Sequence, residues 1–238
     1  MLTQVTTTRA TSRDDAATGT IQADLVRRGL APDRQVVDAG YLSAAIRVAS
    51  QTQRGITLVG PVRENASWQA KAGDGYAASD FLLEWATKTA TCPQGKSSAT
   101  WREVPAGADG TLLQIHFRHA DCQACPVRDR CTRASRRSIT VHLRVEHEAQ
   151  EGARAFQATA AFATEYALRA GIEATISQAV RRCDVRDARY RGLAKTRLQY
   201  LLTGAALNLI RVADWFAAPP PRGDRRAPFV HLLATACP

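Results

Sequence analysis

The chain has 238 residues, of which 45% are apolar, a composition that is ordinary for a globular protein with one sizeable core. Its 32 Lys and Arg residues against 22 Asp and Glu give a formal net charge of +10, which favours a polyanionic partner such as nucleic acid. No apolar run approaches the roughly 20 residues that span a bilayer, so the sequence excludes a membrane-spanning protein and indicates a cytoplasmic one.

Residues 1–60 carry the pattern of an α/β sheet. Glycines that follow apolar periodic runs, Gly29 and Gly55, indicate where two helices end. The expected elements are a strand at 3–8, a helix opened by Asp14 and Asp15, a strand at 36–37, a helix at 43–54 and a strand at 56–60. This alternation predicts an open sheet with crossover helices on its faces. Asp38 then lies at the carboxyl end of its strand, where such sheets bind their ligands.

Residues 61–144 change to glycine-rich turns and short alternating runs, at 81–85, 111–117 and 139–143, which predict a mostly β insertion. Helical periodicity returns over 145–216, first through 166–182 and again from 192 to 216. The last helix has a broad apolar face formed by Leu193, Leu201, Ala205, Leu209, Val212, Trp215 and Phe216. Residues 217–238 are rich in proline and charge, which predicts a loose tail.

Four cysteines fall inside the insertion: Cys92, Cys122, Cys125 and Cys131. Tetrahedral zinc takes four such ligands at about 2.3 Å, and a Cys-x2-Cys turn presents two thiolates at that distance. His116 and His119 are spare candidate ligands. The pattern predicts a structural Zn²⁺ site, against two alternatives: a disulfide, which a reducing cytoplasm disfavours, and four unrelated buried thiols.

Tyr166, Arg169 and Glu173 follow one another at steps of three and four residues, so on one helix all three project from the same face. That face is suited to a phosphodiester, because a basic side chain precedes the carboxylate by one turn. Each acid also has an ordinary reading: Asp38 as a turn or cap residue, and Glu173 as an exposed carboxylate paired with Arg169 or Arg181.

A basic segment follows Glu173, and five of its residues are candidate DNA-binding residues: Arg181, Arg182, Arg189, Arg191 and Lys195. Such runs more often form a solvated, salt-bridged surface. The proximity of this segment to the Tyr166–Glu173 helix favours contacts with DNA phosphates.

These residues resemble the catalytic domain of DDE insertion-sequence transposases, whose C-terminal signature is Tyr, two residues, Arg, three residues and Glu. Asp38 is similar to the second acid of that family and Glu173 to the third. Other stretches similar to the family are 6–8, 60–61, 68–71, the cysteine cluster and 189–196. One departure is Val180, because a basic residue often stands seven positions after the family's glutamate; here Arg181 and Arg182 are beside it.

The resemblance implies an α/β fold: an incomplete ribonuclease-H-like sheet over residues 1–60, a mostly β, cysteine-bearing insertion over 61–144, and C-terminal helices over 145–216. It also implies phosphoryl transfer with two Mg²⁺ ions, in which Asp38 and Glu173 are ligands, Arg169 lies near a phosphate and Tyr166 orients it. The implied partner is DNA at transposon ends. The full-length protein is expected to be a homo-oligomer associated with the bacterial nucleoid.

The first catalytic acid of the family is expected to be missing. In the family it lies on the first strand, and two more strands and a helix precede the second acid. Here one strand-like run and one helix precede Asp38, and Asp14 and Asp15 suit a helix N-cap. The sequence therefore predicts the C-terminal part of a transposase, inactive alone. The alternative is a zinc-stabilised DNA-binding or interaction remnant without catalysis.

Overall fold

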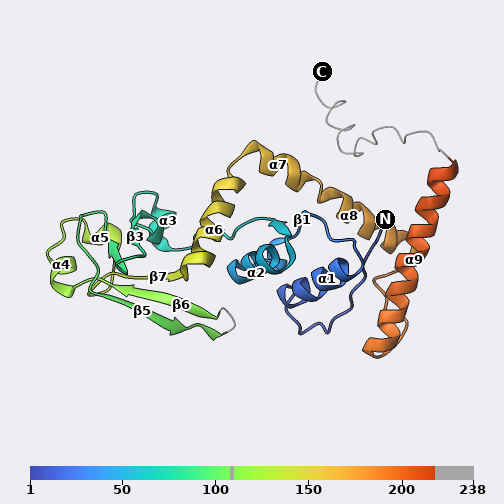
Figure 1. Ribbon diagram of the computed structural model, residues 1–238, viewed down its shortest axis with the longest axis horizontal. Coiled ribbons are helices and arrows are strands. Elements are labelled where there is room, and N and C mark those ends of the chain that lie inside the picture. The colour runs from blue at the N-terminus through green and yellow to red at the C-terminus, as the bar shows by residue number, and fades with distance from the viewer. Residues whose placement is uncertain (108–109, 218–238) are drawn as a thin grey trace, which may run out of the picture. The chain divides into compact units, whose positions relative to one another are not determined.

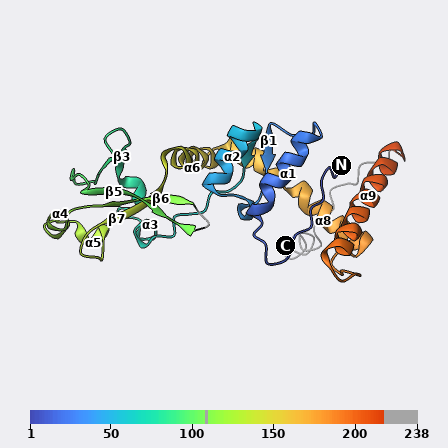
Figure 2. The ribbon, with the colours of Figure 1, turned by 60° about the horizontal axis from the view of Figure 1, so that its bottom comes forward.

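The computed structural model describes residues 1–107 and 110–217 (Figures 1 and 2). The chain divides into two compact units. The core unit comprises residues 8–173, and the terminal unit comprises residues 1–7 together with 174–238, of which 218–238 lie outside the described residues. Over the described ranges no helix has both the length and the apolar character of a membrane span.

The core unit begins with a small parallel sheet and two helices, a mixed α/β arrangement. Helix α1 (Asp15–Arg27) precedes strand β1 (Arg34–Val36), and helix α2 (Ala44–Arg54) connects it to strand β2 (Thr57–Val59). The strands are parallel, with Arg34 opposite Thr57 and Val36 opposite Val59. Helix α2 begins where the Ser43 hydroxyl accepts the Ile46 N–H, and it ends at Gly55 with φ of 68°. The two helices and β2 lie where the sequence predicts them. Strand β1 ends at Val36, where the predicted strand begins, and none of its residues is fully buried.

Three polar side chains connect α1, β1 and α2 in the interior. The Gln22 amide donates to Gln35 Oε1 at 2.9 Å, and the Ser50 hydroxyl donates to Gln22 Oε1 at 2.9 Å. Gln22 and Ser50 are fully buried, at 0% and 1% exposure. Each buried group has a partner, so the network holds the two helices against β1 without unsatisfied donors at these contacts.

The expected strand at 3–8 is not formed. Residues 3–8 have no regular structure, and among the described strands β1 pairs with β2 alone. Residues 1–7 belong to the terminal unit, where the backbone of Leu2 donates to and accepts from the Asn208 side chain at 2.7 Å in each direction. The polar backbone of this segment is thus partly satisfied by a helix rather than by a neighbouring strand.

The region 61–144 contains two antiparallel sheets, as its alternating runs predict. Strands β3 (Leu82–Glu84) and β4 (Thr89–Thr91) form a hairpin, and β5 (Thr100–Pro105), β6 (Thr111–His116) and β7 (Ser138–His142) form a three-stranded sheet. Short helix α3 (Trp68–Ala72) precedes these strands, and α4 (His119–Gln123) and α5 (Arg128–Cys131) lie between β6 and β7. The core of this region consists of Phe81, Ala90, Leu113, Ile115, Phe117, Ile139 and Val141.

The helical region consists of α6 (Arg144–Gln157), α7 (Ala160–Ala167), α8 (Ala170–Cys183) and α9 (Leu193–Ala217). The single helix expected from Tyr166 to Arg182 is interrupted at Leu168 and Arg169, as Figure 1 shows between α7 and α8. There the N–H groups of Arg169 and Ile172 bond three residues back, to Tyr166 and Arg169, at 3.0 and 2.8 Å. Such i→i+3 bonds tighten the backbone and change the helix direction.

The broad apolar face predicted for α9 is not buried. The buried residues of α9 are Gly204 and Leu207, and a Cβ at Gly204 would lie 2.9 Å from the Val5 side chain. Leu209, Trp215 and Phe216 are 71%, 76% and 75% exposed. Helix α9 therefore packs on residues 1–7 through its small-residue side, while most of its apolar side chains face solvent.

Candidate active site

Strand β1 presents Asp38 at its carboxyl end. The strand ends at Val36, and a short 3-10 helix (Ala39–Tyr41) follows Asp38 directly. Asp38 Oδ1 accepts the N–H of Ala39 at 2.9 Å, so one carboxylate oxygen has the cap role that the sequence alternative allows. The second oxygen, Oδ2, remains available for other contacts.

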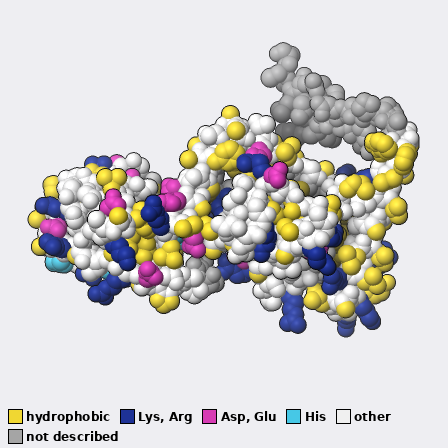
Figure 3. Space-filling model, in the orientation of Figure 1, with side chains coloured by type: hydrophobic (Ala, Val, Ile, Leu, Met, Phe, Trp, Pro, Cys, Tyr) yellow, Lys and Arg dark blue, Asp and Glu magenta, His cyan; other side chains and the backbone are white. Residues whose placement is uncertain are grey.

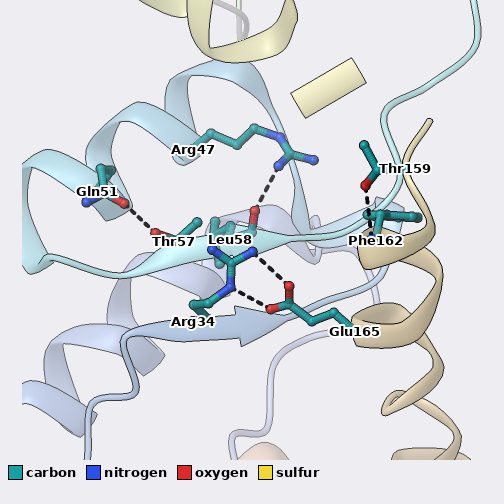
Figure 4. Close-up of polar contacts among 8 residues, drawn as sticks. All are labelled: Arg34, Arg47, Gln51, Thr57, Leu58, Thr159, Phe162 and Glu165. Carbon is teal, nitrogen blue, oxygen red and sulfur yellow. Dashed lines mark hydrogen bonds and ion pairs between the residues drawn. The ribbon is translucent and has the colours of Figure 1, made fainter. Parts of the chain in front are cut away.

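Helix α7 is attached to the same strand by an ion pair (Figure 4). Arg34 of β1 donates from Nε and from Nη2 to the two carboxylate oxygens of Glu165, both at 2.7 Å. These hydrogen bonds lower the pKa of Glu165 and raise that of Arg34. Thr159 caps the start of α7 by accepting the Phe162 N–H at 3.2 Å. The bidentate pair fixes the end of α7 relative to β1.

A half-buried arginine holds the end of the second strand. Arg47 of α2 donates to the carbonyl oxygens of Leu58 and Gly60 at 2.9 and 2.8 Å, and Figure 4 shows the first of these bonds. Burial lowers the pKa of Arg47. A Cβ at Gly60 would lie 2.4 Å from the Val37 carbonyl oxygen, so only glycine permits this close approach beside the end of β1.

The two candidate acids meet on one guanidinium group. Arg169 Nη2 contacts Asp38 Oδ2 at 3.1 Å, and Arg169 Nη1 contacts Glu173 Oε1 at 3.1 Å. Arg169 and Asp38 are separated by 131 positions in the chain. The side chains of Asp38 and Glu173 are 50% and 58% exposed, so both carboxylates are accessible to ligands from solvent. Folding thus brings Asp38, Arg169 and Glu173 together at the surface of the core unit.

Tyr166 has a different environment from the one expected. Because α7 ends at Ala167, Tyr166 and Glu173 lie on separate helices. The Tyr166 ring stacks on Phe162, with ring centroids 5.3 Å apart and planes 9° apart, and its carbonyl accepts the Arg169 N–H at 3.0 Å. Tyr166 contacts Arg169 through the backbone, so in this structure the position of its ring is set by Phe162.

Asp14 does not cap α1. It stands at the N-cap position, but its backbone is already helical and its side chain makes no cap hydrogen bond. Its carboxylate oxygen instead lies 3.3 Å from where a Cβ of Gly40 would be. Burial raises the pKa of Tyr41, and the charges of Asp14 and then Asp38 add to this rise. This proximity was not predictable from the sequence, because local spacing relates Asp14 only to its own helix.

No ready-made metal centre is present in residues 1–107 and 110–217. No three His, Cys, Asp or Glu side chains within those ranges are arranged to hold a metal ion together. Asp38 and Glu173 supply carboxylate oxygens, the donors that Mg²⁺ prefers, and both are accessible. The donor type therefore fits Mg²⁺, while the number of clustered donors is two.

The four cysteines of the insertion line one cavity of about 350 Å³. The N–H of Lys96 donates to Cys92 Sγ at 3.4 Å, and that of Arg137 donates to Cys122 Sγ at 3.3 Å. Burial raises the pKa of the Cys131 thiol, whereas the Arg137 charge lowers it. The four thiols are free, so the disulfide alternative is not realised. Within residues 1–107 and 110–217 the four cysteines do not form a group arranged to hold a metal ion, so the tetrahedral zinc arrangement expected from the sequence is not preformed.

The five candidate DNA-binding residues belong to the terminal unit. Arg181, Arg182, Arg189, Arg191 and Lys195 are all exposed. None of them forms an ion pair with an acid within the part of the chain that the structure describes. Their charges are therefore not neutralised by neighbouring carboxylates, in contrast to the salt-bridged surface that such runs more often form.

Comparison with known proteins identifies one family. A family model described as a transposase DDE domain matches residues 91–213, more than half of the chain. The match includes the four cysteines, Tyr166, Arg169 and Glu173, whereas Asp38 lies before it. No curated protein and no solved structure matches the chain. Transposase DDE domains act on DNA and generally use a divalent metal such as Mg²⁺. The chain belongs to the transposase DDE domain family.

Proposed function

We propose that Asp38 and Glu173 are metal-binding carboxylates of a DNA transposase site that cleaves and joins DNA ends. The observation that carries this proposal is the convergence of the two acids on Arg169, at 3.1 Å each, from distant parts of the chain. A turn aspartate and a helix glutamate without a common function would not be expected to contact the same guanidinium group. The insertion-sequence type and the Tyr-x2-Arg-x3-Glu signature are part of the same proposal.

Each residue has a role in this site. Asp38 and Glu173 hold the cation, and Glu173, in the first turn of α8, also interacts favourably with the positive end of the helix dipole. Divalent ions bound there would lower the pKa of the attacking hydroxyl group and stabilise the leaving oxygen. Arg169 has a guanidinium group suited to bidentate contact with a phosphate, and it neutralises the two carboxylates when no ligand is bound.

Metal binding tests the assignment directly. We expect Mn²⁺, a paramagnetic substitute for Mg²⁺, to broaden NMR signals of residues near position 38 in the wild-type chain. Asp38→Asn and Glu173→Gln should each weaken this binding about tenfold or more, because each removes a charged ligand. Glu103→Gln, a substitution of an exposed carboxylate on β5, is the matched control and should leave it unchanged. Equal Mn²⁺ affinity in the wild type and all three variants would contradict the assignment of Asp38 and Glu173 as metal ligands.

We further propose that the chain alone does not cleave DNA, because a third carboxylate is lacking near the pair in the described residues. An assay of Mg²⁺-dependent cleavage at element ends should therefore show no turnover. Robust turnover that Asp38→Asn abolishes would contradict the need for a third acid but keep the site. Robust turnover that persists in Asp38→Asn would contradict both the need for a third acid and the assignment of Asp38 to the site.

A second candidate function is DNA binding without catalysis, as an interaction remnant of a transposase. It is favoured by the five exposed basic residues that have no acidic partner in the described part of the chain. This function predicts salt-dependent DNA binding that is unchanged in Asp38→Ala and Glu173→Ala. Loss of DNA binding in these variants would instead favour the metal-dependent site.

We propose, in addition, that zinc closes the cysteine cavity. The support comes from the shared lining of one cavity by Cys92, Cys122, Cys125 and Cys131, because four cysteines are a common ligand set for structural zinc. Elemental analysis of chain purified without chelators should give about one zinc per molecule, lost in Cys122→Ser and kept in Cys183→Ser, which changes a cysteine outside this cavity. Metal-free wild-type protein would refute the proposal.

A further inference from the structure

The exposed side of α9 carries apolar residues at a regular spacing. They are Leu198, Leu202, Ala205, Leu209, Val212 and Phe216, at alternating steps of four and three residues. This 3.5-residue repeat is the a and d pattern of a coiled-coil seam. The six residues are called the α9 seam below. It extends over about 27 Å, at a rise of about 1.5 Å per residue.

Every residue of the α9 seam is exposed in the structure. Leu198, Leu202, Leu209, Val212 and Phe216 are 57%, 62%, 71%, 37% and 75% exposed, and Ala205 is also exposed. Figure 3 shows hydrophobic side chains on the surface of this helix. Leu201 and Trp215 widen the seam on one side, at 42% and 76% exposure. Exposed apolar residues in such a row are typical of a surface that binds another protein segment.

The opposite side of α9 is occupied within the terminal unit. Gly204 and Leu207 are buried, and Arg211 donates to Thr175 Oγ1. Asn208, which lies on the flank of the seam between Leu201 and Trp215, bonds the backbone of Leu2. Within the terminal unit, the six residues of the α9 seam make none of these contacts and form an exposed surface beside them. An occupant can cover the six seam residues without displacing the contacts of Gly204, Leu207 and Arg211.

The charge pattern identifies the kind of occupant. From Leu198 to Phe216 the seam positions and the positions flanking them contain no charged residue, because Arg211 and Asp214 lie elsewhere on the helix. Coiled coils that select a different partner do so with charges at the flanking positions. An uncharged seam has no such selectivity, and two copies of it meet without like-charge repulsion.

The order of side-chain sizes indicates the direction of pairing. If two copies of α9 run antiparallel and are centred on residue 207, Leu198 faces Phe216, Leu202 faces Val212, and Ala205 faces Leu209. Each small residue then meets a large one. In a parallel pair Ala205 would face Ala205 and Phe216 would face Phe216, which leaves a gap at one layer and crowding at another.

We propose that the α9 seam binds the α9 seam of a second copy of this chain in an antiparallel, two-fold symmetric pair. Such an interface is self-complementary, because the same surface is contributed by both copies. The proposal does not depend on the catalytic assignment of Asp38 and Glu173, because those residues do not belong to the seam.

The mass of the full-length chain in solution tests the proposal. Analytical ultracentrifugation at micromolar concentration should give a dimer for the wild type and a monomer for Leu202→Glu/Leu209→Glu. Both substituted residues are exposed, so the circular dichroism spectrum should remain that of the wild type. Leu82→Glu, which changes a leucine 76% exposed on β3 and far from the seam in sequence, is the matched control and should remain dimeric.

A charge exchange tests the direction. Leu198→Glu alone should shift the chain toward monomer by at least tenfold in dissociation constant. Leu198→Glu combined with Phe216→Lys should restore the dimer, since each Glu then faces a Lys of the other copy. In a parallel pair the same double variant would place Glu against Glu and remain monomeric, which would overturn the antiparallel arrangement.

Two further results would overturn the proposal as a whole. One is a wild-type chain that is monomeric, and that becomes dimeric when residues 218–238 are deleted, which would identify that segment as the occupant. The other is a dimer that persists in Leu202→Glu/Leu209→Glu, which would place the interface elsewhere.

Discussion

Arg169 is the residue on which the candidate site depends, because it holds two carboxylates that would otherwise repel each other. Its guanidinium group is 28% exposed and contacts Asp38 and Glu173 at equal distances. A divalent cation that binds the same two carboxylates must compete with this guanidinium group. Arg169 and the metal are therefore alternative counter-ions for one pair of acids.

We expect Arg169→Ala to bind Mn²⁺ about three to ten times more tightly than the wild type, because each exposed ion pair that the metal must disrupt contributes up to about 1 kcal/mol. The same variant should bind DNA more weakly, since a phosphate contact is lost. Isothermal titration with Mn²⁺, and separately with duplex DNA, measures both. Weaker Mn²⁺ binding in Arg169→Ala would mean that the arginine supports the metal rather than competing with it.

Some contacts of the candidate site could be predicted from the sequence, and others could not. The spacing of Arg169 and Glu173 was readable, because i,i+4 neighbours on a helix are fixed by its geometry. The contact of Arg169 with Asp38 and the pair between Arg34 and Glu165 were not predictable from spacing, since each joins positions 131 apart. No local pattern encodes such a distance.

At the scale of elements, the ion pair between Arg34 and Glu165 determines where α7 ends relative to β1. Hydrogen bonding to Arg34 lowers the pKa of Glu165 in the folded state. A lowered folded pKa stabilises the protein above the unfolded value of about 4.3, and this stabilisation is lost as pH falls through the folded value. The pair is partly exposed, so its contribution is below about 1 kcal/mol.

Glu165→Gln should therefore lower the free energy of unfolding by up to about 1 kcal/mol at pH 7. The difference from the wild type should shrink below about pH 4.3, where the wild-type carboxyl group also becomes neutral. Urea unfolding at the two pH values measures this. Glu148→Gln is the control, because its ion pair with Arg144 lies on the exposed surface of a single helix. An equal effect of both substitutions at pH 7 would show that the link to β1 adds nothing.

Elements were predicted well where their boundaries are local. Helix α2 matches the prediction because Ser43 and Gly55 are cap residues whose effect needs no tertiary contact. The prediction of one helix through Arg169 was wrong. Its residues favour a helix, and helix propensity does not indicate the backbone bonds to the third residue back that accompany the break. The apolar face of α9 was readable from the sequence, but its exposure was not, because periodicity identifies a face and not what covers it.

At the scale of the whole molecule, a group of basic residues that form no ion pair with the described acids lies in one part of the chain. The formal net charge is +10, and the five unpaired basic residues lie on α8, on α9 and in the segment between them. Because each phosphate contact releases about 0.9 counter-ion, the number of contacts determines how steeply DNA affinity falls with salt.

Replacing Arg181, Arg182, Arg189, Arg191 and Lys195 together by alanine should flatten the plot of log affinity against log salt by up to about 4 units of slope. The control removes the same charge from exposed residues of the core unit, through alanine at Arg63, Lys71, Lys88, Arg102 and Arg118. Fluorescence anisotropy with duplex DNA at several salt concentrations measures the slope. A larger change in the control would place the DNA-binding surface on the core unit.

The buried contacts between Gln22, Gln35 and Ser50 have a consequence for the fidelity of folding. Strand β1 has only three residues, so its apolar pattern is too short to define how it aligns with β2. If the register of β1 against β2 shifted by one residue, the Gln35 side chain would point to the opposite face of the sheet. The buried Gln22 amide would then lose its hydrogen-bond partner. These hydrogen bonds thus favour the observed register of β1. Because Asp38 follows Gln35 by three residues, the same register also places Asp38 beside Arg169.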